Sequence, residues 1–387
     1  MLSRFAGFAA PTLLAALALL AACTAQPPLP TTDPPAGTPS WRVPAGPGPA
    51  LTQVDFDHLP GWKLDRVAEA MPAFLDGCAR TDANPGVKLG GAGEASLRAG
   101  TGAQWRSVCA AARAVPRNDD AAARTFFEAN FQPYGLSSDG SAAGLFTGYY
   151  EPEIRGSRTP GSGYRSAIYR RPADLAPGGA PYFSRAAIES GALSRKKLEL
   201  LYLADPLDNF FLHIQGAGRV TLPDGHVARV SYDGQNGQSY VPIGRVLVDR
   251  GEMPLEQVSM QSIRAWLQAH PKDARSVMNQ NPSYVFFREL PGLSADAGPP
   301  GAMGVKLTPM RSIAVDKSFI PLGAPVWVDT QDPLDGTKLR RLMMAHDLGG
   351  AIKGPVRSDI FFGWGRDAEE RAGRMRQPGT EFVLLPR

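Results

Sequence analysis

Residues 345–365 read AHDLGGAIKGPVRSDIFFGWG, and this pattern decides the fold class. The apolar run Leu342–Ala345 leads into the segment, Gly and Pro fill its middle, and the apolar run Ile360–Phe362 follows Asp359. Short apolar runs punctuated by Gly and Pro are typical of strands and turns. The segment therefore predicts strands joined by tight turns, with its aspartates in strand or turn positions.

The same pattern of short apolar runs separated by Gly and Pro extends through most of the chain after Gly135. The 387 residues include 42 Gly and 36 Pro, which favours a β-rich or mixed fold, and the length predicts roughly two domains. We expect strands at Leu145–Tyr150, Phe210–Gln215, Pro325–Val328 and Leu342–Ala345. We expect helices at Leu193–Leu203, Leu255–His270 and Ala368–Met375.

Residues 62–135 have a different, helical pattern. Apolar residues recur at helical spacing around Val67–Leu75, in Trp105–Val115 and in Ala121–Phe131, which predicts three packed helices. Cys78 and Cys109 fall in two of these segments. A disulfide between them and a pair of buried free thiols both fit this pattern.

The N-terminus predicts export. Arg4 precedes an apolar stretch that ends in Leu20-Ala21-Ala22-Cys23, which resembles the lipobox of bacterial lipoproteins, where the signal is cut before a lipid-modified cysteine. A plain signal peptide or a short membrane anchor is the alternative. Residues 23–55 are rich in Pro and predict an extended tether. By analogy with lipoprotein sorting, the absence of Asp after Cys23 indicates the periplasmic side of the outer membrane.

Composition and spacing disfavour several function classes. The net charge is +4, but Lys and Arg are scattered, so nucleic acid is not an expected partner. The five histidines and the cysteines show no spacing typical of a metal site, and we expect neither a metal nor a cofactor. Gly349 and Gly354 match the glycine spacing of a phosphate-binding loop, but Pro355 replaces the required lysine.

Asp316, Asp347 and Asp359 are the acidic residues with candidate chemistry. A lone Asp beside Gly usually stabilises a turn. Asp359 differs because an apolar aromatic run follows it, so poor hydration can raise its pKa. An acid that is protonated near neutral pH is what cleavage of a glycosidic bond requires.

Several long motifs resemble the MltA family of membrane-bound lytic transglycosylases, whose C-terminal part is the 3D domain. The motifs are GYYEP (148–152), DPLDNFFLHIQGAG (205–218), YDGQNGQSYVPIGRVL (232–247), NPSYVFF (281–287) and GGAIKG (349–354). The resemblance implies a double-psi β-barrel built from residues 56–150 and 293–387, with the 3D domain at about 303–387. It also implies a second β domain inserted at 151–292 and a glycan groove between the domains.

The resemblance further implies a lyase that acts on peptidoglycan during cell wall turnover. Asp359 would act as acid and then as base, with Asp347 and Asp316 in support, leaving 1,6-anhydromuramic acid ends. Residues expected to contact glycan are Gln215, Tyr149, Tyr150 and Lys353, with Phe210, Phe211 and Trp364 as further aromatic candidates. Cell wall synthesis or hydrolysis complexes are further expected partners. The alternatives are a lysozyme-like hydrolase and a non-catalytic peptidoglycan-binding lipoprotein.

Overall fold

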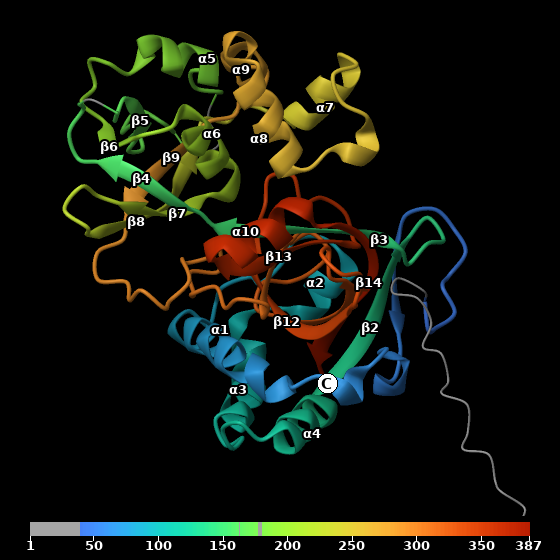
Figure 1. Ribbon diagram of the computed structural model, residues 1–387. Coiled ribbons are helices and arrows are strands. Elements are labelled where there is room, and N and C mark those ends of the chain that lie inside the picture. The colour runs from blue at the N-terminus through green and yellow to red at the C-terminus, as the bar shows by residue number, and fades with distance from the viewer. Residues whose placement is uncertain (1–38, 162, 177–179) are drawn as a thin grey trace, which may run out of the picture. The chain divides into compact units, whose positions relative to one another are not determined.

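The computed structural model describes residues 39–161, 163–176 and 180–387, and its strands form two sheets (Figure 1). The order of the first sheet is β1-β2-β14-β11-β12-β10-β13-β3. Its strands are β1 Pro49–Gln53, β2 Phe131–Ser138, β3 Gly144–Glu151, β10 Ser312–Val315, β11 Pro325–Gln331, β12 Lys338–Leu348, β13 Arg357–Trp364 and β14 Arg376–Pro386. The order of the second sheet is β5-β6-β4-β7-β8-β9. Its strands are β4 Glu153–Ser157, β5 Ser166–Tyr169, β6 Glu199–Leu203, β7 Ala217–Thr221, β8 Val227–Gln235 and β9 Val285–Glu289.

The first sheet closes into a barrel because β14 pairs with β3 as well as with β11. The closed ring is β14-β11-β12-β10-β13-β3. Two of its pairings are parallel, β10 with β12 and β13 with β3, and the others are antiparallel. Closure removes exposed strand edges, and six of the seven residues of β11 are buried.

Helices from the N-terminal part pack around this barrel (Figure 1). They are α1 Met71–Ala83, α2 Glu94–Ala99, α3 Arg106–Ala112 and α4 Asp120–Asn130. Trp62, just before α1, packs against Trp327 of β11 with ring centroids 5.2 Å apart. A buried bidentate ion pair joins Asp65 to Arg311, with N–O distances of 2.7 and 2.9 Å. These contacts attach the helical segment to the C-terminal strands.

Cys78 of α1 and Cys109 of α3 form a disulfide, with their Cα atoms 5.5 Å apart. Both side chains are buried, and the two helices pack directly against each other. The sequence was compatible with a disulfide and with two free thiols, and the structure contains the disulfide.

The second sheet has helices of its own (Figure 1). They are α5 Arg185–Ala187, α6 Pro206–Gln215, α7 Ile243–Asp249, α8 Met260–Ala269 and α9 Pro271–Met278. A separate apolar cluster, which includes Phe210, Phe211, Leu247 and Val277, lies among α6 to α9. The helix α10 Gly365–Arg374 returns to the barrel and packs on β3 and β13. A barrel with an inserted second β domain is thus confirmed.

The prediction of a strand at Phe210–Gln215 is wrong, because these residues end α6. Asp205 caps this helix by accepting a 2.8 Å hydrogen bond from the Leu207 N–H, and Pro206 occupies the first turn. Gly216 ends it with a φ of +77°, a backbone conformation that glycine adopts without strain. The sequence contains both the capping residues, which favour a helix, and an apolar run, which also suits a strand.

The prediction of a helix at Leu193–Leu203 is also wrong, since its second half is β6. Leu200, Leu201 and Leu203 are all buried, and a short apolar run fits a strand covered on both faces as well as a helix. The helix expected at Leu255–His270 starts later, at Met260, because the Ser259 side chain caps it by accepting a hydrogen bond from Ser262.

The predicted tether at residues 23–55 is too long at its C-terminal end. Residues 49–53 form β1, which pairs with β2, and Trp41 is buried with its ring centroid 4.7 Å from that of Phe382. Apolar side chains scattered among prolines thus join the core. The signal segment and Cys23 lie outside the described residues.

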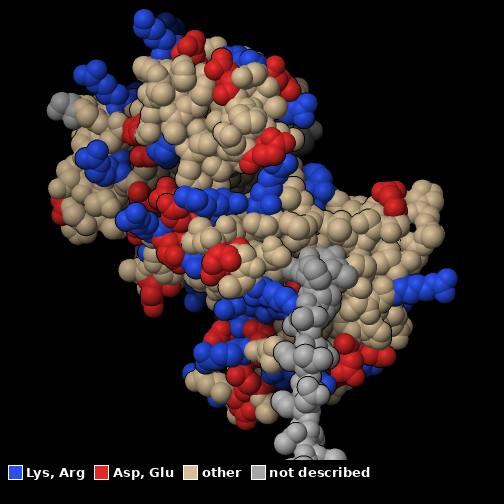
Figure 2. Space-filling model, turned by 45° about the vertical axis from the view of Figure 1, so that its right-hand side comes forward, with Lys and Arg blue, Asp and Glu red and all other residues tan. Residues whose placement is uncertain are grey.

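On the face shown in Figure 2, Lys and Arg lie among Asp and Glu rather than in one basic patch. Within the described ranges, no helix is both long enough and apolar enough to cross a bilayer.

Candidate active site

Asp359 lies near the start of β13, between two neighbouring strands. Its register partners are Thr147 of the parallel strand β3 and Ala314 of the antiparallel strand β10. Because side chains alternate along a strand, Ser358 and Ile360 point to the opposite face. Both are fully buried, whereas Asp359 is partly exposed. The strand thus presents this carboxyl on the accessible face.

Two neighbours stabilise the Asp359 carboxylate. The Thr147 hydroxyl donates a 2.7 Å hydrogen bond to Oδ1, and Arg357 donates a 2.9 Å hydrogen bond to the Thr147 oxygen. Desolvation nevertheless dominates and raises the pKa of Asp359 to about 6, although Arg357 and Thr147 lower it and the charge of Asp347 raises it further. A carboxyl with this pKa can both give and take a proton near neutral pH.

Asp347 lies in the same row of the sheet as Asp359. Ala314 of β10 pairs with Asp347 of β12 on one side and with Asp359 of β13 on the other. Neighbouring strands are about 4.8 Å apart, so the two Cα atoms are roughly 10 Å apart. Asp347 and Asp359 therefore flank the same residue of β10, one on each neighbouring strand.

The hydrogen bonds of Asp347 hold it in place. Its Oδ1 accepts from the backbone N–H groups of Ala302 and Leu348, at 2.8 and 2.9 Å. Its Oδ2 accepts a 3.0 Å hydrogen bond from the Tyr149 hydroxyl. Burial raises the pKa of Asp347, and these three donors oppose that shift. Both oxygens of this carboxyl are thus occupied by protein donors.

Asp316 stabilises turns next to these strands. Its Oδ1 accepts from the Ser318 N–H at 3.0 Å, and its Oδ2 accepts from the Gly354 N–H at 3.1 Å. Partial burial raises the pKa of Asp316, but the two N–H donors outweigh it and lower the pKa overall. Asp316 therefore ties the glycine-rich turn after β12 to the turn after β10.

Two protein-family models match this chain. Residues 145–288 match the MltA specific insert domain, and residues 311–385 match the 3D domain. Membrane-bound lytic murein transglycosylase A of Escherichia coli is 40% identical over 246 residues, which are 62% of this chain and 65% of that protein.

Solved structures cover more of the chain. The membrane-bound lytic murein transglycosylase of Agrobacterium tumefaciens is 35% identical, with a TM-score of 0.77, over 87% of this chain and 98% of that one. Escherichia coli MltA with bound chitohexaose is 30% identical, with a TM-score of 0.65, over 90% and 96% of the two chains. This chain belongs to the MltA family. The sequence alignment spans just under two thirds of the Escherichia coli relative.

The two tyrosines of the family motif GYYEP point to opposite faces of β3. Tyr149 is buried beside Phe361, and its hydroxyl binds Asp347. Tyr150 is also buried, and its hydroxyl donates a 3.3 Å hydrogen bond to Glu369 of α10. Protein contacts thus hold both side chains, and Tyr150 also lines a cavity.

Gln215 contacts β3, and Lys353 lies on the turn between β12 and β13. The Gln215 Oε1 accepts a 3.0 Å hydrogen bond from the Tyr150 N–H, which joins the end of α6 to β3. Lys353 is exposed on the glycine-rich turn, and its charge acts on Asp316.

The other aromatic candidates are mainly packing residues. Phe210 and Phe211 are buried among the helices of the second domain. The Arg219 guanidinium lies 3.9 Å from the centroid of the Trp364 ring, which is partly buried. This contact covers part of the indole.

Sequence reasoning missed Thr147, Arg357 and Tyr240. The first two reach Asp359 through strand pairing between segments about 210 residues apart, a relationship that single-sequence periodicity does not reveal. Tyr240 is 39% exposed. Desolvation raises the pKa of its phenol, and the charge of Arg185 lowers it. The charge of Asp359 also raises this pKa, so the ring lies within electrostatic range of Asp359.

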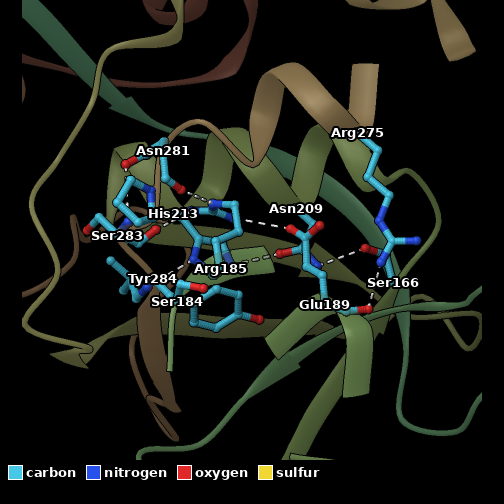
Figure 3. A network of polar contacts seen from close by, with 12 residues as sticks. Ser166, Ser184, Arg185, Glu189, Asn209, His213, Arg275, Asn281, Ser283 and Tyr284 are labelled. Carbon is cyan, nitrogen blue, oxygen red and sulfur yellow. Dashed lines mark hydrogen bonds and ion pairs between the residues drawn. The ribbon is translucent and has the colours of Figure 1, made fainter. Parts of the chain in front are cut away.

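Figure 3 shows a network of polar contacts around Arg185, His213 and Asn281, and Asn281 also contacts the loop that carries Tyr240. Asn281 accepts a 3.1 Å hydrogen bond from the Val241 N–H, and Arg185 donates to the carbonyls of Asn281 and Ser283. His213 accepts a 3.0 Å hydrogen bond from the Val285 N–H, and burial lowers its pKa. These hydrogen bonds give the family motifs that contain these residues a structural role, because they hold the backbone of the loop.

A cavity of about 500 Å³ lies where β3, α6, α8 and α10 meet. Tyr150, Phe211, Arg264 and Glu369 are among its lining residues, and Asp359 is not. The part of the chain that the structure describes contains no group of three or more His, Cys, Asp or Glu residues placed to hold a metal.

Proposed function

We propose that this chain is a peptidoglycan lytic transglycosylase that cleaves the β-1,4 bond between N-acetylmuramic acid and N-acetylglucosamine. The observation that carries the proposal is the Asp359 carboxyl, which is partly exposed and has a pKa of about 6 in an MltA-family barrel. The named activity of the relatives and the chitohexaose bound to the Escherichia coli protein support the same substrate class.

In the proposed reaction, Asp359 first protonates the bridging oxygen and then accepts the proton of the muramoyl C6 hydroxyl as that oxygen attacks C1. The C1–O bond to the departing sugar breaks, a bond from C6 oxygen to C1 forms, and the product is a 1,6-anhydro sugar. A single carboxyl returns to its starting state, and no water is consumed.

The environment of Asp347 argues against the hydrolytic alternative. Hydrolytic glycosidases need a second carboxyl that is free to attack C1 or to activate water. The second nearby acid here is Asp347, and both its oxygens accept hydrogen bonds from protein donors. We assign Asp347 to tuning Asp359 through like-charge repulsion, and Asp316 to holding the adjacent turn.

For glycan contacts we propose Gln215, Lys353 and Tyr240. Tyr240 presents an exposed ring whose phenol is within electrostatic range of Asp359, and the Gln215 amide nitrogen would bind an acetamido or hydroxyl group. Tyr149 and Tyr150 would act indirectly, through Asp347 and α10.

We further propose the domain division that the family resemblance implies, with 151–292 as the insert and the remainder of 56–387 as the barrel. The strands of the second sheet, which all fall between residues 153 and 289, support it. The barrel domain would begin earlier than residue 56, since β1 pairs with β2.

For location we propose a lipid anchor on Cys23 at the periplasmic side of the outer membrane, with cell wall complexes as partners. The name of the relatives, membrane-bound, supports membrane association. Mass spectrometry of the mature N-terminus tests the anchor, since an unmodified Cys23 contradicts it.

Digestion of purified murein tests the activity. The full chain is expected to release muropeptides with 1,6-anhydromuramic acid ends. Reducing muramic acid ends without anhydro product would identify a hydrolase. Glycan binding without any cleavage would identify a binding protein.

A further inference from the structure

Glu381 is a carboxyl buried inside the barrel that the proposed reaction does not use. It lies on β14 with no exposed surface, and its Oε2 accepts a 2.6 Å hydrogen bond from the Ser358 hydroxyl. Among the described residues, its Oε1 has no hydrogen-bond partner. Since buried polar atoms are usually satisfied, a buried carboxyl with one bare oxygen needs an explanation.

Glu381 contacts the residue that directly precedes Asp359. That residue is Ser358, whose hydroxyl donates to the Glu381 carboxyl. The Arg357 side chain, on the other face of β13, donates to Thr147, which donates to Asp359. Glu381 therefore holds one face of β13 through Ser358, and on the other face the neighbouring Arg357 is linked through Thr147 to Asp359.

The surroundings favour a neutral Glu381. Desolvation raises its pKa to about 7, while Ser358 and Arg357 lower it. The positive charge of Arg357, on β13, is the charge that lowers the pKa of Glu381. Asp329 of β11 is paired with Arg340 of β12, and Tyr134 of β2 lies under Arg98.

We propose that Glu381, buried inside the barrel and bonded to Ser358, is a positioning residue that holds β13 so that Arg357 and Thr147 meet the Asp359 carboxyl. Ionisation of Glu381 places an unsatisfied charge in the interior and competes with Asp359 for Arg357. The proposal rests on the function proposed for Asp359 as the acid.

The pH dependence of kcat/KM on murein separates this role from a merely structural one. Above pH 7 the wild-type chain loses activity through two ionisations, those of Asp359 and Glu381, so the profile approaches a hundredfold loss per pH unit. The Glu381→Gln variant cannot ionise there and is expected to lose only tenfold per unit. A uniform loss at every pH with an unchanged slope would overturn the proposal.

Two further variants strengthen the test. Ser358→Ala removes a donor to the carboxylate, so the second ionisation moves to higher pH; an unmoved profile contradicts the proposal. This variant also decides the question where Glu381→Gln does not fold. The control is Glu94→Gln, an exposed glutamate of α2, which leaves the wild-type slope unchanged.

A measurement without activity keeps the two proposals distinguishable. In the full-length Asp359→Asn chain, infrared spectroscopy is expected to show the carbonyl band of a neutral carboxylic acid at pH 6. The part of that band that Glu381→Gln removes is expected to disappear above pH 8, whereas Asp347, whose pKa burial also raises, contributes equally in both chains. Absence of that part of the band at pH 6 overturns the neutral Glu381, whereas failure of the wild-type chain to cleave murein overturns the proposed function alone.

Discussion

The Thr147 hydroxyl donates a 2.7 Å hydrogen bond to the Oδ1 atom of Asp359, across 212 residues of sequence. The bond joins β3, from the part of the chain before the second domain, to β13, from the part after it. The candidate acid is therefore complete only when the barrel has closed, because neither part of the chain supplies both groups.

Removing the Thr147 hydroxyl is expected to shift the alkaline limb of activity to higher pH. A hydrogen bond donated to the carboxylate favours its ionised form, so Thr147→Val raises the pKa of Asp359 above about 6 and keeps the acid protonated over a wider range. The pH profile of kcat/KM measures the shift. Thr125→Val, on an exposed position of α4, is the control and is expected to leave the limb in place. A shift to lower pH in Thr147→Val would contradict this account.

Asp359→Asn is expected to reduce murein cleavage by about 10³-fold, within the range that one general acid contributes. Binding of a chito-oligosaccharide is expected to persist, because the amide keeps the shape of the carboxyl. Product mass spectrometry and calorimetry measure the two properties. Asp249→Asn, an exposed aspartate of α7, serves as the matched variant. Equal cleavage by both variants would remove Asp359 from the mechanism.

The buried pair between Asp65 and Arg311 is expected to matter more for stability than an exposed one. Asp65→Ala leaves Arg311 without its bidentate partner and is expected to lower the free energy of unfolding by about 3–5 kcal/mol. Asp57→Ala breaks the exposed pair with Lys63 and is expected to cost under about 1 kcal/mol. Denaturant unfolding of both variants checks the difference, and equal losses would contradict it.

Breaking the disulfide is expected to destabilise the chain by about 2–4 kcal/mol. The double variant Cys78→Ala/Cys109→Ala removes a link across 31 residues between α1 and α3. Its denaturant midpoint is expected to be insensitive to reductant, whereas that of the wild-type chain falls when reductant is added. A wild-type midpoint that ignores reductant would show that the bond does not stabilise the fold.

The sequence predicted much of the fold because its local signals were strong. The barrel strands β3, β11 and β12 and the helices α1, α3, α4 and α10 follow from periodicity and from Gly and Pro punctuation. Errors fell where two signals competed. In α6, the cap by Asp205 and the ending at Gly216 outweighed an apolar run that also suits a strand.

The candidate site was predictable only in part. Asp359 stood out through its aromatic flank, but Thr147, Arg357 and Glu381 act through pairings between distant strands. Such pairings depend on barrel closure and strand register, which the period of a single strand does not encode. The contacts of Tyr149 with Asp347 and of Tyr150 with Glu369 were not predictable for the same reason, because they join distant segments of the chain.

Tyr240 offers a direct test of the side of the site formed by the second domain. Its loop is held by Asn281 and Arg185, so replacing the ring removes a contact without loosening the backbone. Tyr240→Ala in the Asp359→Asn chain is expected to weaken chito-oligosaccharide binding at least about fivefold, which corresponds to about 1 kcal/mol. Tyr232→Ala is the matched control, since Tyr232 is 48% exposed on the same motif and the charge of Asp359 does not contribute to its pKa. Calorimetric titration compares the two variants, and equal affinities would exclude Tyr240 from the glycan contacts.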